Sequence, residues 1–180
     1  RVDAVKIGMV SQTPIIKVIA ERLAHYKPSI IVLDTVMVSK SGFDLLEPEA
    51  CSTLINELMP LANLVTPNLP EAEKIVGYEV ESKDMMEKAA AKIIAMGPKA
   101  VLVKGGHLTE TADDYLYANG KGEWYPAERI DTKNTHGTGC TLSSSLAADL
   151  ANGLSLEEAV KASKAYVTLA IKHALPLGHG

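Results

Sequence analysis

The chain has 180 residues, of which 47% are hydrophobic, and a formal net charge of −4 at pH 7. Its length suits one well-formed core and is short for two, so we expect a single domain over residues 1–180. The 18 lysines and arginines are scattered, which excludes a basic footprint for nucleic acid. Because no apolar run approaches the roughly 20 residues that cross a bilayer, we expect no membrane partner either.

The two cysteines, Cys51 and Cys140, lie far apart and outside any C-x-x-C spacing. This spacing indicates neither a zinc site nor a disulfide framework, and we expect a reducing, cytoplasmic location. Cys51 shares a helical face with leucines and an isoleucine, so we interpret it as packing. The chain opens at Arg1 in strand-like sequence without an initiator Met, and we expect it to be incomplete.

Strand-like and helix-like segments alternate along the first 104 residues. Thr13 is expected to cap the first helix, with Pro14 at its first position and Lys27-Pro28 at its end. Ser82 is expected to cap a later helix, and Ser155 to Glu158 has the pattern of a capping box. The predicted strands are 3–10, 29–34, 62–66, 100–104, 114–118 and 123–129, and the predicted helices are 13–27, 48–59, from 70, 83–96, 141–152 and 155–173.

The strand over 29–34 is apolar throughout, which is typical of a parallel sheet buried on both faces. The last two strands are joined by Asn119-Gly120-Lys121-Gly122, a sequence typical of a hairpin turn. The order of elements therefore predicts an α/β fold with three layers, α/β/α. Its central sheet should be mostly parallel, with an antiparallel hairpin at one edge.

Polar residues follow the ends of several predicted parallel strands. Asp34 ends one strand, Asn68 and Glu71 follow the next, and Lys104 ends another. These ends share one edge of a parallel sheet, where ligands bind in open α/β proteins. Two carboxylates could hold Mg²⁺ there and a lysine could neutralise phosphate. The alternative interpretation makes Asp34 and Glu71 loop or helix caps, and Lys104 a solvated strand end.

The segment Asn134-Thr135-His136-Gly137-Thr138-Gly139-Cys140 runs directly into the predicted helix 141–152. Its glycines permit a tight turn, and the unpaired N–H groups at a helix start form an anion site. We expect the same helix end to lower the pKa of Cys140 below its free value of about 8.5. The alternative is a glycine-rich turn with a small, half-buried cysteine. Together, the lysine, carboxylates and loop are the parts needed for phosphoryl transfer.

These residues resemble a known family along essentially the whole chain. The resembling motifs are Lys6-Ile7-Gly8-Met9, Val32-Leu33-Asp34-Thr35-Val36-Met37, Thr66-Pro67-Asn68-Leu69-Pro70-Glu71-Ala72, Lys104-Gly105-Gly106-His107 and residues 132–143. They are similar to the hydroxymethylpyrimidine/phosphomethylpyrimidine kinases, the thiamine-pathway branch of the ribokinase-like superfamily. In this branch the glycine loop ends in Cys, whereas most members of the superfamily have Asp.

The resemblance implies an ATP- and Mg²⁺-dependent kinase whose anion hole is formed by residues 137–140. Cys140 would be the base or hydrogen-bond partner of the acceptor hydroxyl, and Lys104 would contact ATP phosphate. Asp34 and the Asn68-x-x-Glu71 motif would organise Mg²⁺. Gly137, Thr138 and Gly139 would have this catalytic role in the anion hole, and the remaining residues that the resemblance places at the nucleotide are Thr135, His136, Gly137 and Gly139.

For the acceptor, the resemblance implies that Met9 and Val36 touch the pyrimidine and that Lys164 reaches the active site. The alternative for Lys164 is an exposed helix lysine. Relatives also begin with a glycine-rich strand and flap that form much of the pyrimidine pocket, and nothing here matches them. We therefore expect this chain to lack that region and the extreme C-terminus, and the resemblance suggests a homodimer.

The expected reaction is phosphorylation of 4-amino-5-hydroxymethyl-2-methylpyrimidine and then of its monophosphate. A pyridoxine or pyridoxal kinase of the same cysteine-bearing branch is the nearest alternative, because its acceptor also presents a hydroxymethyl group on a flat ring. Two further alternatives are a thiol hydrolase or acyltransferase that uses Cys140 with His136, and a nucleotide-binding module without catalysis.

Overall fold

The computed structural model of the chain describes residues 2–39, 42–106, 108, 111–130, 132 and 135–175. His107, Lys133 and Asn134, which belong to two of the quoted motifs, lie outside the described residues.

The centre of the molecule is a sheet that runs through the described residues in the order β1-β2-β3-β4-β5-β6. The first four strands are parallel, and β5 and β6 add an antiparallel hairpin at one edge, as predicted. The strands are β1 (Val5–Ile7), β2 (Ile31–Leu33), β3 (Leu64–Val65), β4 (Ala100–Val103), β5 (Asp114–Ala118) and β6 (Lys121–Tyr125).

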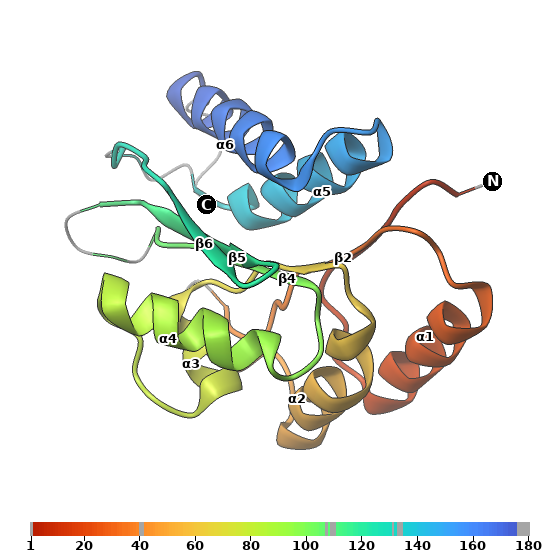
Figure 1. Cartoon of the computed structure of the whole chain (residues 1–180). Coiled ribbons are helices and arrows are strands. Elements are labelled where there is room, and N and C mark those ends of the chain that lie inside the picture. Colours follow the sequence, from red (N-terminus) through yellow and green to blue (C-terminus); the bar gives the residue numbers. More distant parts are fainter. Residues whose placement is uncertain are drawn as a thin grey trace.

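Helices cover both faces of this sheet (Figure 1). One face carries α1 (Thr13–Tyr26), α2 (Pro48–Thr53), the π-helical turn η1 (Leu54–Leu58), the 3₁₀ turn η2 (Met59–Leu61), α3 (Leu69–Val76) and α4 (Lys83–Ile94). The other face carries α5 (Thr138–Ala151) and α6 (Leu156–Lys172). Because the parallel strands follow one another in space, right-handed crossovers put α1 to α4 on one side, and the last two helices cover the other.

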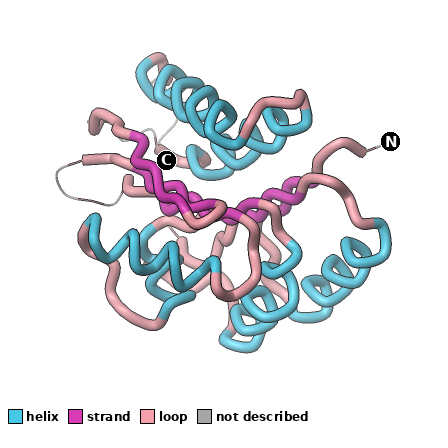
Figure 2. The backbone as a smooth tube through the Cα atoms, viewed as in Figure 1, coloured by secondary structure: helices cyan, strands magenta, loops and turns pink. Residues whose placement is uncertain are grey.

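The strands β2, β3 and β4 each contribute residues to two hydrophobic cores, one on either side of the sheet. Figure 2 shows the helices as layers on either side of the strands. Leu33, Val65 and Val101 pack with the core under α1 to α4. Val32 and Leu64 alternate with them and pack with the core under α5 and α6. The predicted burial of both sheet faces and the three-layer architecture are thus confirmed. The predicted packing role of Cys51 also agrees, since it lies against the first core.

Several predicted boundaries were wrong. The strand predicted over 3–10 extends only over Val5–Ile7. Gln12, not Thr13, is the N-cap of α1, and it makes no side-chain capping bond. The helix predicted over 48–59 is an α-helix only to Thr53 and continues as a π-helical and then a 3₁₀ turn. Apolar periodicity does not distinguish these helix types, because each keeps buried residues on one side.

The hairpin turn is shorter than predicted. β6 begins at Lys121, so the turn consists of Asn119 and Gly120, whose φ angles are 52° and 74°. Two successive residues with positive φ form the tight turn that matches the twist of a hairpin. By contrast, the predicted caps at Ser82 and Ser155 are confirmed, the latter as a complete capping box with Glu158.

Candidate active site

Polar residues from separate elements meet at the carboxyl edge of the parallel strands. Asp34 directly follows β2, and Lys104 directly follows β4. The Lys104 Nζ lies 3.2 Å from the Asp34 Oδ1. Lys104 also pairs with Asn68 in a parallel β-bridge, and its N–H donates to the Pro67 carbonyl at 2.8 Å. The structure therefore brings together the strand-end residues that the sequence placed at one edge.

Asp34 is the centre of this cluster and is 1% exposed. Its Oδ1 accepts a hydrogen bond from the Thr66 hydroxyl at 3.3 Å in addition to the Lys104 contact. Its Oδ2 accepts one from the Ser143 hydroxyl at 3.0 Å and lies 3.9 Å from the Lys6 Nζ. Two ammonium groups and two hydroxyls thus compensate the burial of this carboxylate, as a buried charge requires.

Sequence reasoning gave no role to Lys6 or Ser143. The available signal for Lys6 was a lysine inside an otherwise apolar strand, in the motif Lys6-Ile7-Gly8-Met9. Ser143 lies one helical turn after Cys140, at a fully buried position of α5. A polar side chain at a buried position of a helix requires a partner, and that requirement was the signal for Ser143.

The amino end of α5 forms the second part of the site. The helix begins at Thr138 rather than at Thr141 as predicted, with Gly137 as its N-cap at a φ of 78°. The N–H of Thr141 donates to the Gly137 carbonyl at 2.9 Å. The N–H groups before it have no carbonyl partner inside the helix and point out of its positive end.

Lys104 lies directly against this helix end. A Cβ atom added at Gly139 would lie 3.2 Å from the Lys104 Nζ. The absence of a side chain at Gly139 therefore leaves room for the ammonium group beside the first turn of α5. A lysine and a helix amino terminus at one point form a strong site for a phosphate group.

The prediction for the pKa of Cys140 was wrong. Its pKa is raised, first by partial burial of the thiol and then by the nearby charge of Asp34. Lys6 and Lys104 act in the opposite direction. Neither the burial of the thiol nor its position beside a buried carboxylate could be read from the local sequence. Cys140 is therefore a thiol at neutral pH.

Glu71 and Asn68 form the amino-terminal capping box of α3. The Asn68 Oδ1 accepts from the Glu71 N–H, and the Glu71 Oε2 accepts from the Asn68 N–H, both at 2.9 Å. Glu71 also accepts a hydrogen bond from Thr35. Burial raises the pKa of Glu71, which is 2% exposed. The capping role that we gave as an alternative for Glu71 is therefore present, and it does not exclude a role at the site.

A cleft with a volume of about 1760 Å³ runs along this edge. Its wall includes Asp34, Glu71, Lys104 and Cys140, together with Lys164 from α6. Among the other predicted site residues, its lining includes Val36, Asn68, Thr135, His136, Gly137, Thr138 and Gly139. Most of the site residues predicted from the sequence therefore line one cleft.

Met9 lies outside the cleft lining, and Lys164 is mostly buried rather than exposed. Met9 is 55% exposed and is not part of the cleft lining. The side chain of Lys164 is only 14% exposed, and its Nζ lies 2.5 Å from the Asp114 Oδ2. The alternative of an exposed helix lysine was therefore wrong, because Lys164 forms a mostly buried ion pair.

In the loop before α5, His136 is exposed, and the Thr138 hydroxyl donates to the carbonyl of Thr135 at 2.9 Å.

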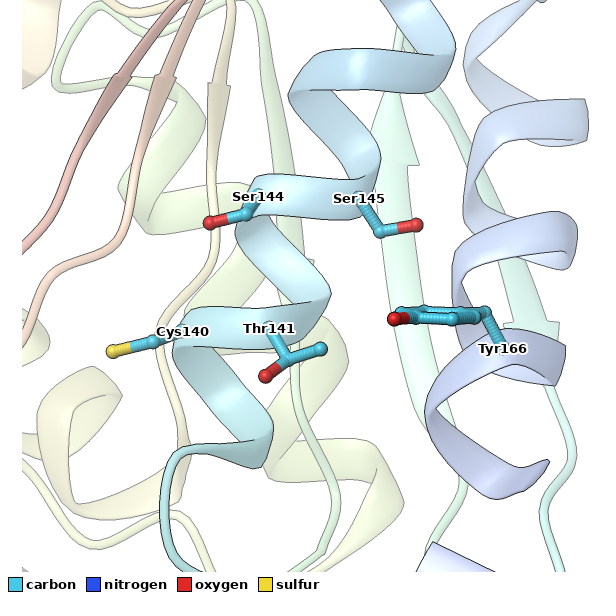
Figure 3. A pocket seen from close by; sticks show the side chains of 5 residues that line it. All are labelled: Cys140, Thr141, Ser144, Ser145 and Tyr166. Carbon is cyan, nitrogen blue, oxygen red and sulfur yellow. The ribbon is translucent and has the colours of Figure 1, made fainter. Parts of the chain in front are cut away.

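A second, smaller pocket of about 520 Å³ lies between α5 and α6 and is lined by Cys140, Thr141, Ser144, Ser145 and Tyr166. In Figure 3 the Cys140 thiol points away from the Tyr166 ring. Burial of the thiol and the charge of Asp34 both raise the pKa of Cys140, whereas a thiol hydrolase requires an imidazole that activates the thiol.

The described residues contain no cluster of three or more His, Cys, Asp or Glu side chains that could hold a metal ion. Mg²⁺ in phosphoryl-transfer sites commonly uses one or two carboxylates together with the phosphates. Glu71 at the cleft wall fits that pattern better than Asp34, whose oxygens already contact two lysines.

Within the described part of the chain, no helix is long and apolar enough to cross a membrane.

The family model for phosphomethylpyrimidine kinase matches residues 1–180. The chain is 48% identical to the hydroxymethylpyrimidine/phosphomethylpyrimidine kinase of Rhizobium meliloti, covering 99% of this chain and 68% of the relative. It is 43% identical to the thiamine biosynthesis bifunctional protein ThiED of Geobacter sulfurreducens, covering 99% of this chain and 37% of that protein. The chain thus spans from just over a third to about two thirds of these relatives' lengths.

Two solved structures share the fold. The phosphomethylpyrimidine kinase of Clostridium difficile aligns with a TM-score of 0.84 and 46% identity, over 94% of this chain and 69% of that one. The ADP complex of Bacillus subtilis pyridoxal kinase aligns with a TM-score of 0.92 and 41% identity, over 98% of this chain and 67% of that one. These matches confirm the expected fold and the resemblance to a kinase family.

Proposed function

The chain belongs to the phosphomethylpyrimidine kinase family, and we propose that it carries the phosphoryl-transfer site of an ATP-dependent hydroxymethylpyrimidine and phosphomethylpyrimidine kinase. The reaction would phosphorylate the hydroxymethyl group of 4-amino-5-hydroxymethyl-2-methylpyrimidine and then the resulting monophosphate. Relatives at 43% to 48% identity that carry this activity in their names, or a role in thiamine biosynthesis, support the proposal.

The observation that carries the proposal is the position of Lys104. Its ammonium lies both 3.2 Å from the Asp34 carboxylate and against Gly139 at the amino end of α5. A phosphoryl group at this point would face a lysine and the N–H groups of residues 138 to 140. These groups would stabilise the charge that develops on the transferred phosphoryl oxygens.

In the proposed reaction, the acceptor hydroxyl oxygen attacks the γ-phosphorus of ATP in line. The new O–P bond forms as the bond from the γ-phosphorus to the bridging oxygen of ADP breaks, and the hydroxyl proton passes to water. Because the pKa of Cys140 is raised, its thiol acts as a hydrogen-bond partner of the acceptor oxygen. A strong base is not required, since the transition state of phosphoryl transfer is loose.

Asp34 orients Lys104 and Lys6 in this scheme, because its buried carboxylate contacts both ammonium groups. Glu71 is the described carboxylate best suited to hold Mg²⁺, with Asn68 fixing its position through the capping box. Mg²⁺ bound there with ATP would neutralise phosphate charge and favour in-line geometry. We retain Met9 and Val36 as pyrimidine contacts, and Thr135 and His136 as residues near the phosphates.

A pyridoxal kinase is the second candidate, and one observation favours it. The Bacillus subtilis pyridoxal kinase structure aligns with a TM-score of 0.92, against 0.84 for the Clostridium difficile phosphomethylpyrimidine kinase. Sequence identity favours the pyrimidine kinase, at 46% against 41%. We further propose that residues 1–180 are part of one kinase domain that forms a cytoplasmic homodimer, on the support of the family resemblance and the cysteine spacing.

The test is ADP release by the full-length gene product with ATP and Mg²⁺. The acceptors to compare are hydroxymethylpyrimidine, its monophosphate, pyridoxal and none, with Cys140→Ala as the control variant. Turnover on both pyrimidines that is reduced in the variant would support the proposal. Turnover on pyridoxal alone would favour the second candidate, and no acceptor-dependent ADP release would refute both.

A further inference from the structure

Asp114, the first residue of β5, joins two segments that line the cleft. It is 6% exposed, and each of its carboxylate oxygens has a different partner. The Oδ1 accepts a hydrogen bond from the Gly105 N–H at 2.9 Å. The Oδ2 accepts one from the Lys164 Nζ at 2.5 Å. One carboxylate therefore holds both the main chain after β4 and a side chain of α6.

The first partner fixes the position of Lys104. Asp114 binds the N–H of the peptide that links Lys104 to Gly105, and the N–H of Lys104 itself donates to Pro67 at 2.8 Å. A Cβ atom at Gly105 would lie 1.9 Å from the Asp113 carbonyl oxygen. The backbone after Lys104 is thus pressed directly against the start of β5, where Asp114 begins the strand.

The second partner, Lys164, is held by two acceptors. Its ammonium donates to Asp114 and, at 3.1 Å, to the carbonyl of Ala112. An ammonium group has three N–H donors, so two of them are directed by these contacts. Lys164, Asp114, Ala112 and Lys104 all line the same cleft. The two lysines are therefore connected through Asp114 on one continuous wall.

The neighbouring residue Asp113 also binds one lysine and one backbone N–H, but it lies outside the cleft lining. Its carboxylate accepts from the Lys83 Nζ at 2.6 Å and from the Ala127 N–H at 3.0 Å. Lys83 begins α4, on the sheet face opposite α6, and neither Lys83 nor Asp113 lines the cleft. The chain thus contains two adjacent carboxylates, each with one lysine and one backbone N–H, of which only Asp114 faces the site.

We propose that Asp114 is a positioning residue, which holds Lys104 and Lys164 in fixed places on the cleft wall so that both ammonium groups face the nucleotide phosphates. This inference rests on the proposed function. Stability alone is a poor reason for such a pair, because a buried ion pair rarely stabilises a fold more than apolar residues would. Precise placement of charge, by contrast, is what phosphoryl transfer requires.

The test compares Asp114→Asn with Asp113→Asn in the full-length gene product. Asparagine keeps an acceptor for the backbone N–H and removes the charge that holds the lysine. Both variants are expected to lower the melting temperature by a similar amount. Only Asp114→Asn should lower kcat/KM for ATP, on the order of 10²-fold, which is the effect of misplacing a catalytic group by about 1 Å. Equal kcat/KM values for the two variants would overturn the proposal.

A double variant tests whether Asp114 acts through Lys164. In a Lys164→Met background, Asp114→Asn should lower kcat/KM much less than it does alone, whereas fully additive losses would overturn the inference. The double variant also buries no unpaired charge, so it can be compared with Lys164→Met if Asp114→Asn alone does not fold. Similar kcat/KM values for these two proteins would then support the inference, and a further loss of about 10²-fold in the double variant would overturn it.

Failure of the proposed function would be recognised separately, because the unaltered protein would then show no acceptor-dependent ADP release. In that case calorimetric titration with ATP provides the readout. Weaker ATP binding by Asp114→Asn than by Asp113→Asn would support the positioning role, and equal binding would overturn it.

Discussion

Because Gly139 lies against Lys104, a Gly139→Ala variant can test whether the position of Lys104 controls activity without lowering the stability of the protein. Gly139 lies inside α5, and its φ is not positive. Replacing a helical glycine with alanine usually stabilises a protein by about 0.4–1 kcal/mol. Gly139→Ala should therefore leave the melting temperature of the protein unchanged or slightly raised.

The same methyl group would crowd the site. The added Cβ would lie 3.2 Å from the Lys104 Nζ, which is itself 3.2 Å from the Asp34 Oδ1. The ammonium would have to shift by a few tenths of an ångström, away from the amino end of α5. We expect kcat/KM for ATP to fall about tenfold, which corresponds to about 1.4 kcal/mol of transition-state stabilisation.

The matched comparison is Gly137→Ala, two residues earlier. No atom lies within 4 Å of a Cβ at Gly137, but its φ is 78°. Alanine there would carry a backbone cost of about 1–2 kcal/mol. Gly137→Ala should thus lower the melting temperature, whereas Gly139→Ala should lower ADP release. If Gly139→Ala keeps its full kcat/KM, the position of Lys104 does not control the reaction and our reasoning about the site is refuted.

Two further predictions concern Cys140 and the capping boxes. Burial and, after it, the Asp34 charge raise the pKa of Cys140, so Asp34→Asn should lower that pKa. Alkylation by iodoacetamide at pH 8, measured by mass spectrometry in a Cys51→Ser background, should then be several-fold faster, and an unchanged rate would contradict the role of the Asp34 charge. Asn68→Ala and Ser155→Ala each remove a capping box, so each should cost about 1 kcal/mol, or roughly 2–4 °C in melting temperature. Only Asn68→Ala should reduce ADP release, and equal activity of the two variants would remove Asn68 from the site.

Much of the fold could be predicted because its signals are local. Apolar runs such as that over β2 indicated strands buried on both faces, and the capping residues Ser82 and Ser155 marked helix starts. Most errors fell at element ends, and one fell inside the helix predicted over 48–59. Periodicity did not show that the helix after Pro48 changes to a π-helical turn, because both geometries bury one side of the segment.

The candidate site was predicted unevenly for a related reason. Lys104 and Asp34 were found because both follow parallel strands, whose ends share one edge of the sheet. Lys6 and Ser143 were missed, since their role depends on contact with Asp34 across distant parts of the chain. No local pattern reports such a contact.

The sequence by itself determined the order of strands and helices, the parallel sheet with its hairpin, and the residue types available for phosphate chemistry. Hydrophobic patterning and turn chemistry depend only on neighbouring residues, which is why these features could be read directly. The raised pKa of Cys140 and the ion pair of Lys164 with Asp114 could be determined only from the tertiary structure. Burial and the distance between charges control both, and these quantities exist only after residues far apart in the chain have been brought into contact.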